Sequence, residues 1–332
     1  YDGARARPEG TVWKPNTGVS GGGPGGGYGV ARARTALPAP AGGEHARARE
    51  WQLVKIVMHS YTFRTYPLDA AFRAARQFGW EGIELQPCHF DRESIDAELP
   101  RCMDVGRAYG VSIACVDFGG DFIHEDPAAV EQSVAAAETL IDACGRHGVA
   151  LINGGVGSLS VDAADYGRNG SALATEAHYD RAAEAFRHLG PFAGRRGVRI
   201  VFEIHMNMLH DTVASTVKLL DKIGCDNVMA NPDPGNMFST STAEHEAGAL
   251  ERLRGRIGYF HFKNCCLHAG QYNYSVKLAD GHIDLNTYVQ QLVDLGYDES
   301  VCVEYCGEGD PHVAAEEDIR YLRACLDRAR GT

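Results

Sequence analysis

The sequence predicts an α/β protein built as a (β/α)8 TIM barrel with an irregular N-terminal extension. From Leu53 onward, short apolar runs alternate with segments of helical periodicity, which gives eight β/α units spaced by about thirty residues. The apolar runs are almost continuous, as parallel strands covered on both faces require. The alternative is an open, doubly wound sheet, but no Gly-x-Gly-x-x-Gly turn follows the first run.

The first fifty residues differ from the rest of the chain. Residues 1–50 are rich in Gly, Pro and Arg and contain few large apolar side chains. Alone, such a segment buries too little surface to offset its ordering entropy, so we expect it to be disordered on its own. It is either a solvated tail or an arm that orders against a neighbouring subunit. The predicted domains are therefore an arm at 1–50 and a catalytic barrel at 51–332.

Four strands and four helices are predicted in the first half of the barrel. The strands are residues 53–58, 82–85, 111–116 and 149–152. The helices are expected at 68–78, after Asp91, after Asp126, and at 176–189. The third helix has the clearest start, because Asp126 is a good N-cap residue and Pro127 suits the first helical turn.

The second half continues the alternation and adds a polar side chain at the end of each strand. Apolar runs are found at 198–203, 227–233, 257–261 and 301–304, with helices expected at 211–223, 243–253, 285–295 and 311–328. The polar residues at the ends of these runs are Glu203, Asp233, His261 and Glu304. In a parallel barrel the carboxyl ends of the strands converge on one rim. Each residue alone could be a helix cap or an ion-pair partner, but together they predict a divalent-metal site with carboxylate and imidazole ligands.

Five short fragments carry a resemblance to a known family. They are Phe202-Glu-Ile-His205, Asn231-Pro-Asp-Pro-Gly-Asn236, Tyr259-Phe-His-Phe-Lys263, Gly281-His-Ile-Asp284 and Val303-Glu304. In their order and spacing, the chain from Leu53 to about Ala329 resembles the sugar phosphate isomerase/epimerase family, the xylose isomerase-like TIM barrels. The resemblance implies that Glu203, Asp233, His261 and Glu304 hold one divalent metal, Mn²⁺ in first place and otherwise Mg²⁺, Co²⁺ or Zn²⁺.

The same resemblance implies a reaction. A sugar or polyol would lose a proton next to a carbonyl, through a metal-stabilised enediolate, and be isomerised or epimerised. Glu203 and Glu304 would flank the substrate, one removing the proton and the other returning it. His205 lies two residues after Glu203, so it is expected on the same face as a further acid/base group or a contact to a substrate hydroxyl.

Other polar residues are expected to line the site and bind the substrate. Lys263 follows His261 by two residues and can neutralise a developing oxyanion or pair with a site carboxylate. The opposite wall is expected to come from the first strands, although solvated loop positions explain these residues equally well. The predicted substrate-binding set is His59, Glu84, His89, Asn236 and Lys263.

Two positions depart from the ketose 3-epimerases. Asn236 and Leu267 stand where those enzymes have a histidine and an arginine that grip the substrate. This disfavours plain ketohexose epimerisation and leaves a lyase with the same site as the alternative. Such a lyase would be an inosose-type dehydratase or the catalytic subunit of a C-glycoside deglycosidase that acts on 3-oxo-glucosides. A barrel that binds a ligand without turnover is a third hypothesis.

Composition limits the class of partners. A net charge of −12 argues against nucleic acid, whose phosphates require a basic face. No apolar stretch is long enough to cross a bilayer, and no signal-peptide pattern is found. Ten cysteines without a Cys-x-x-Cys pair favour a reducing, cytoplasmic location. The expected partners are a small carbohydrate and other subunits, as a homo-oligomer or with a small second subunit, with the arm at the interface.

Overall fold

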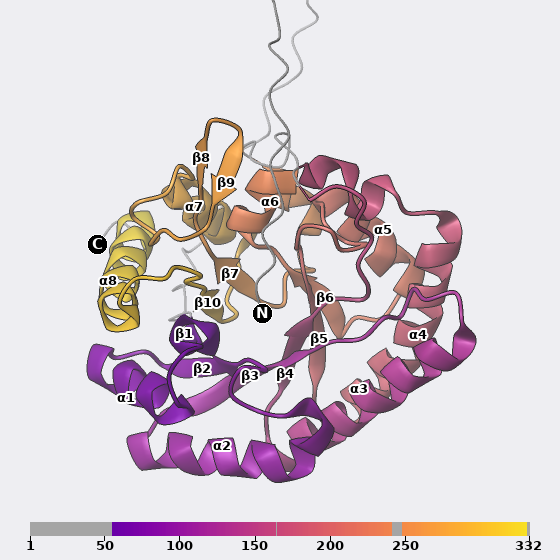
Figure 1. The fold of residues 1–332 in the computed structure, drawn as a ribbon, viewed down its shortest axis with the longest axis horizontal. Coiled ribbons are helices and arrows are strands. Elements are labelled where there is room, and N and C mark those ends of the chain that lie inside the picture. Colours follow the sequence, from indigo (N-terminus) through magenta and orange to yellow (C-terminus); the bar gives the residue numbers. More distant parts are fainter. Residues whose placement is uncertain (1–54, 164, 241–247, 331–332) are drawn as a thin grey trace, which may run out of the picture. The chain divides into compact units, whose positions relative to one another are not determined.

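Eight parallel strands form a nearly closed barrel in the computed structural model, which describes residues 55–163, 165–240 and 248–330 (Figure 1). The strands are β1 (Ile56–His59), β2 (Gly82–Leu85), β3 (Ser112–Phe118), β4 (Leu151–Gly154), β5 (Arg199–Glu203), β6 (Val228–Asn231), β7 (Phe260–Phe262) and β10 (Val301–Val303). The TIM-barrel prediction is confirmed. The predicted N-terminal arm lies outside the described residues.

The strands pair in an order that brings the first and last units together. β1 pairs with β2 and with β10, β10 pairs with β7, and β2 to β6 follow one another. Between β6 and β7 the ladder is reduced to one parallel bridge, Ala230 to Ile257, and a backbone hydrogen bond from His261 N–H to the Pro232 carbonyl at 3.0 Å. Two backbone hydrogen bonds of Ala230, to Arg256 at 2.8 Å and from Gly258 at 3.0 Å, hold this bridge.

A ring of helices surrounds the strands (Figure 1). The helices are α1 (Leu68–Phe78), α2 (Ile95–Tyr109), α3 (Pro127–His147), α4 (Glu176–Gly194), α5 (Val213–Ile223), α6 (Pro234–Thr240), α7 (Leu285–Leu295) and α8 (Pro311–Arg330). α3 begins as its sequence predicts, since the Asp126 side chain accepts a hydrogen bond from the backbone N–H of Ala128. No helix in the described part of the chain is long and apolar enough to cross a membrane.

Three features differ from the sequence prediction. The helix expected at 243–253 falls partly outside the described residues, and its described part is wrong, because Ala249–Leu253 forms a 3₁₀ helix. Gly248 precedes it with φ of 96°, a left-handed conformation that an α-helix does not pass through. The short helix α6 was not predicted and follows β6 directly. A small antiparallel hairpin of β8 (Cys266–His268) and β9 (Gln271–Asn273) was not predicted either.

Side chains inside the barrel form an apolar layer with a polar layer above it. The inner apolar cluster consists of Val57, Cys115, Val201, Tyr259 and Cys302. Two residues further along the same strands stand His59, Asp117, Glu203, His261 and Glu304. Because strand side chains alternate between faces, these polar groups also face the interior, at the carboxyl ends of the strands. The fold therefore collects them at one rim.

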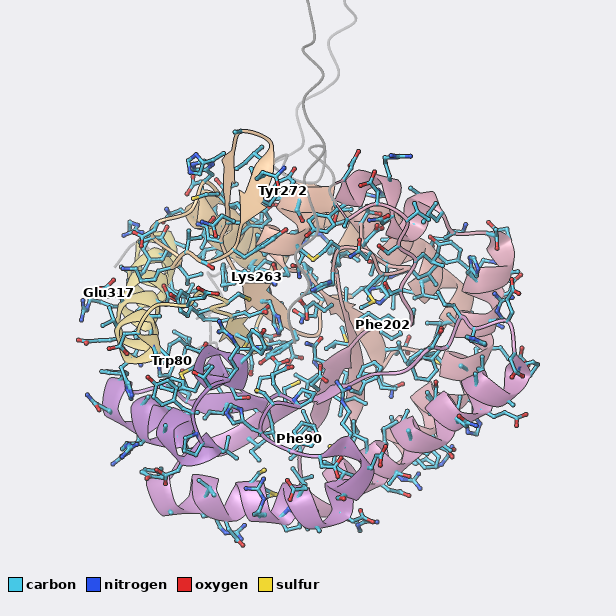
Figure 2. All side chains as sticks on the ribbon, in the orientation of Figure 1. Trp80, Phe90, Phe202, Lys263, Tyr272 and Glu317 are labelled. Carbon is cyan, nitrogen blue, oxygen red and sulfur yellow. The ribbon has the colours of Figure 1, made fainter. Side chains whose placement is uncertain are left out.

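The outer face of the strands packs on the helices. Phe202 of β5 is fully buried, and its ring lies 4.7 Å from that of Phe186 on α4. Figure 2 shows Lys263 inside the ring of helices, whereas Glu317 of α8 lies at its outer edge. The barrel wall thus separates an apolar outer layer from the polar site inside.

Candidate metal centre

The four predicted metal ligands converge. Glu203, Asp233, His261 and Glu304 each offer one ligand atom, and these atoms lie within 4.8 Å of one another. From His261 Nδ1, carboxylate oxygens of Glu203, Asp233 and Glu304 lie at 3.7, 3.9 and 3.7 Å. They are brought together from the end of β5, the turn between β6 and α6, β7, and the residue after β10.

Two atoms at the centre of this group are buried without a hydrogen bond, although Asp233 Oδ2 forms an ion pair with Lys263 Nζ at 3.3 Å. His261 Nδ1 and Asp233 Oδ2 have no hydrogen-bond partner among the described residues. Buried polar atoms are normally paired, and leaving one unpaired costs about 1–3 kcal/mol. Burial also raises the pKa of Asp233 above its ordinary range. A divalent cation would pair with both atoms, and oxygen and imidazole donors without thiolate suit Mn²⁺, Mg²⁺ or Co²⁺. The residues present therefore fit a metal.

Glu84 holds the far side of the His261 ring. His261 Nε2 donates to Glu84 Oε2 at 2.8 Å. Burial alone would lower the pKa of His261, but the charges of Glu84 and Glu203 raise it well above its ordinary value, so Nδ1 becomes an acceptor when a cation replaces its proton. The other oxygen, Oε1, accepts from Gln86 at 3.1 Å and from Asn153 at 3.0 Å. Burial alone would raise the pKa of Glu84, but the charge and hydrogen bond of His261 lower it to about 2. Glu84 is therefore a carboxylate that fixes the orientation of His261.

The two glutamates are the ligands that reach open space. A cavity of about 580 Å³ lies beside the centre and is lined by Glu203 and Glu304. Their side chains are 15% and 12% exposed, whereas those of Asp233 and His261 are fully buried. A molecule in the cavity would contact the glutamates and lie above the other two ligands.

Neighbouring side chains hold both glutamates in place. Asn236 Nδ2 donates to Glu203 Oε1 at 2.7 Å, and Lys263 Nζ donates to Glu304 Oε2 at 2.8 Å. Burial alone would raise the pKa of Glu304, but the Lys263 ammonium and other neighbours lower it well below its ordinary value. The Cys306 thiol also donates to Glu304 Oε1, at 3.1 Å. The two carboxylates are thus fixed by different donors.

The predicted catalytic and substrate-binding residues fall into two groups. His205 and His59 line the cavity. Glu84, Asn236 and Lys263 are buried behind it and contact the metal-ligand residues. Substrate contact stays a prediction for all of them, and the contacts of the second group favour a positioning role.

His89 has a different environment. Its Nε2 lies 3.2 Å from the carbonyl oxygen of Phe63 and 3.1 Å from that of Tyr66. It is not among the described side chains that line the cavity. These contacts tie His89 to the backbone of the segment after β1, so its predicted contact with a substrate has no support in this geometry.

Sequence reasoning did not single out three residues of the site. Asn231 Nδ2 donates to Asn153 Oδ1 at 3.0 Å, and Asn153 in turn donates to Glu84. Both asparagines stand two residues after interior side chains, Leu151 and Met229, so the period of two could have indicated them. Arg92, which lines the cavity and pairs with Asp117, begins the short 3₁₀ helix Arg92–Ser94, where no such pattern applies.

Comparison with known sequences gives a family match and one partial relative. A family model described as a xylose isomerase-like TIM barrel matches residues 72–325. An inosose dehydratase from Bacillus licheniformis is 29% identical over 176 residues, which are 46% of this chain and 55% of that relative. The match thus spans about half of the relative's length.

Solved structures share the fold. An L-ribulose 3-epimerase superposes with a TM-score of 0.67 at 20% identity, covering 84% of this chain and 96% of that one. A xylose isomerase-like TIM barrel protein from Mycobacterium smegmatis, in complex with magnesium, also gives a TM-score of 0.67 at 20% identity, covering 85% and 98%.

Proposed function

This chain belongs to the xylose isomerase-like TIM barrel family, and from that premise we propose that it is a divalent-metal-dependent isomerase or epimerase of a sugar or polyol. The observation that carries the proposal is the convergence of Glu203, Asp233, His261 and Glu304, of which two buried atoms make no hydrogen bond within the described residues. The epimerase fold and the magnesium complex among similar structures support it. Manganese remains our first choice of metal.

Each group at the cavity has a task in this proposal. When bound, the metal acts as a Lewis acid that makes a C–H next to a carbonyl acidic. Glu203 and Glu304 face the cavity, so one accepts the substrate proton and the other returns a proton to the same carbon. Lys263 keeps Glu304 oriented through its hydrogen bond.

The two histidines at the cavity supply hydrogen bonds to hydroxyl groups. His205 Nδ1 lies 2.9 Å from the Met206 carbonyl and donates to it, so Nε2 is left as an acceptor. For His59, burial lowers the pKa below its ordinary value, which keeps the ring neutral. A neutral His59 ring binds a hydroxyl without adding charge to the site.

A lyase that uses the same residues is the second candidate. The match to an inosose dehydratase favours it, because elimination also begins with the removal of a proton next to a carbonyl. A C-glycoside deglycosidase subunit stays a prediction from sequence resemblance. Cytoplasmic location, oligomeric assembly and an interface role for residues 1–50 also stay predictions.

Solvent exchange tests the proposal. The protein with Mn²⁺ in D₂O is incubated with a ketohexose, an inosose and a 3-oxo-glucoside, and deuterium entry is followed by NMR. Glu203→Gln and Glu304→Gln should each slow exchange by about 10²–10⁴-fold, because each removes a proton-transfer group. Glu308→Gln, at an exposed position nearby, should match the unaltered protein. Unchanged exchange in either site variant would refute the assigned roles.

The same samples separate the candidate reactions. Exchange that leaves every substituent in place indicates an isomerase or epimerase. Loss of water or of a phenol from the substrate indicates a lyase. A chelator should stop either reaction, with restoration by Mn²⁺, Co²⁺ or Mg²⁺. Binding of sugars without any exchange would instead indicate a barrel without turnover.

A further inference from the structure

We infer that the cavity beside the metal centre takes uncharged carbohydrates and rejects phosphorylated or carboxylated ones, and that the Arg92–Asp117 pair sets this selection. The inference rests on the proposed function, since it concerns the substrate class of the same site. Its basis is the charge of the cavity lining.

Acidic side chains dominate that lining. Asp117, Asp121, Glu203 and Glu304 all face the cavity, whereas Arg92 is the only lysine or arginine among the described lining residues. A divalent cation together with the Lys263 ammonium balances the three carboxylate ligands of the centre and leaves no surplus of positive charge. An anionic substrate group would therefore meet a field of its own sign, which disfavours binding.

Arg92 is already engaged. Its guanidinium forms an ion pair with Asp117, whose side chain is 16% exposed. Asp117 stands two residues after Cys115 of the inner cluster, so strand geometry fixes it toward the interior. The guanidinium also lies against Gly119, where a Cβ atom would be 3.0 Å from Arg92 Nη1. The pair is held from both sides, and its positive member is neutralised in place.

The other basic groups near the cavity are not free for an anion. Lys263 is 3% exposed, and its Nζ lies 2.8 Å from Glu304 Oε2 and 3.3 Å from Asp233 Oδ2. His59 Nε2 lies 3.7 Å from the buried Glu84 carboxylate. Strong binding of phosphate or carboxylate uses charge-assisted hydrogen bonds from cations that are available. Among the described lining residues, no lysine or arginine offers one unpaired.

A neutral polyol fits the same surface. The paired carboxylate accepts hydrogen bonds and the guanidinium donates them, and a sugar hydroxyl can do both. The lining also includes Gly119, Gly120, Gly154 and Gly155, and of these Gly119 lies against Arg92. The cavity volume of about 580 Å³ lies within the range of about 300–1,000 Å³ for small-molecule sites.

Removing the negative member of the pair tests the inference. Binding of inorganic phosphate, myo-inositol and myo-inositol 1-phosphate is measured by calorimetry on the full chain, with Mn²⁺ and after chelation. Asp117→Asn frees Arg92, so phosphate and inositol phosphate should bind at least about tenfold more tightly than to the unaltered protein. The gain should be absent from the double variant Arg92→Gln/Asp117→Asn.

Two further variants complete the design. Asp96→Asn, which breaks a remote surface pair with Arg146, is the matched control and should gain no phosphate affinity. If Asp117→Asn fails to fold, Asp121→Asn removes a negative charge from the same lining and should raise phosphate affinity a few-fold. Absence of a gain in a folded Asp117→Asn or, in its place, Asp121→Asn variant would overturn the inference. Binding of inositol phosphate to the unaltered protein as tight as that of inositol would do the same.

The outcome is separable from that of the proposed function. Mn²⁺ affinity and deuterium exchange are measured on the same samples. If the unaltered protein shows neither Mn²⁺ binding nor deuterium exchange, but Asp117→Asn still binds phosphate more tightly, the proposed function is refuted and the charge selection is retained. Exchange on a phosphorylated sugar would remove the charge selection and leave the enzyme.

Discussion

The two ring nitrogens of His261 have different tasks. Nε2 donates to Glu84 at 2.8 Å, and Nδ1 faces three carboxylates without a hydrogen-bond partner among the described residues. The Glu84 carboxylate therefore holds the proton of Nε2, so that Nδ1 is the nitrogen that would give up its proton and present a lone pair to a metal. Glu84 is fully buried and is not among the described residues that line the cavity, yet in this way it can control the metal affinity of the site.

Replacing this carboxylate should weaken the metal site. In Glu84→Gln the amide presents an N–H or a neutral oxygen to His261, so the ring loses its fixed tautomer. We expect Mn²⁺ affinity to fall about 10–100-fold with the fold retained. Titration calorimetry measures the affinity, and circular dichroism checks the fold. Glu98→Gln, at the surface partner of Arg101, is the control. Equal Mn²⁺ affinity in both variants would contradict this role.

Other site residues show what the sequence could and could not reveal. The four metal ligands could be predicted because each stands at the end of an apolar run. Asn153 and Asn231 follow the same period of two along their strands. Arg92 has no such signal, since its place at the cavity depends on where the segment after β2 folds. The environment of His89 depends in the same way on the backbone of residues 63 and 66.

At the scale of elements, α8 contains a buried carboxyl that connects it to the segment before α7. Asp318 is 2% exposed and accepts a hydrogen bond from the Leu278 backbone N–H at 2.8 Å. Burial raises its pKa from 3.8 to about 7. Between these values the folded protein keeps a proton that the unfolded chain has released. The free energy of unfolding should therefore fall as pH rises through this window.

Removing this charge should raise stability at high pH. Asp318→Asn keeps the oxygen that accepts from Leu278 but has no proton to lose. Above pH 7 the variant should be more stable than the unaltered protein, by on the order of 2–4 kcal/mol, and near pH 4 the two should be alike. Urea denaturation at both pH values measures the difference. A constant difference across the range would show that Asp318 is not the titrating group.

Helices and strands differ in how well the sequence predicted them. α1 and α7 have the predicted bounds, because amphipathic periodicity and a following glycine mark both. α6 has seven residues and begins Pro-Gly-Asn, so neither periodicity nor propensity indicates it. The strands of the hairpin β8–β9 have three residues each, too few to show an alternation. Long elements were thus predictable, and short ones depend on their tertiary surroundings.

At the scale of the whole molecule, the metal ligands are distant in sequence and meet only in the folded barrel. In the sequence, the β/α units β6–α6 and β7–α7 lie between Glu203 and Glu304. A cation that needs all four ligands binds the native state and not the unfolded chain. Its binding free energy therefore adds to the stability of the entire domain.

Metal should raise the unfolding temperature of the protein. With free Mn²⁺ at one hundred times its dissociation constant, the free energy of unfolding should increase by about 2.7 kcal/mol. Scanning calorimetry with and without Mn²⁺ measures the change. Asp233→Asn removes a buried ligand and should lose most of the increase. A melting curve of the unaltered protein that does not respond to Mn²⁺ would contradict a metal site at this position.

The barrel has its shortest strand pairing between β6 and β7, where one bridge and one further backbone hydrogen bond replace a continuous ladder. Asp233 follows β6, and His261 belongs to β7. A metal ion bound by both residues would cross-link the two strands. Metal binding and closure of the barrel would then be coupled. In the metal-free protein, β6 and β7 would separate first, because they share the fewest backbone hydrogen bonds.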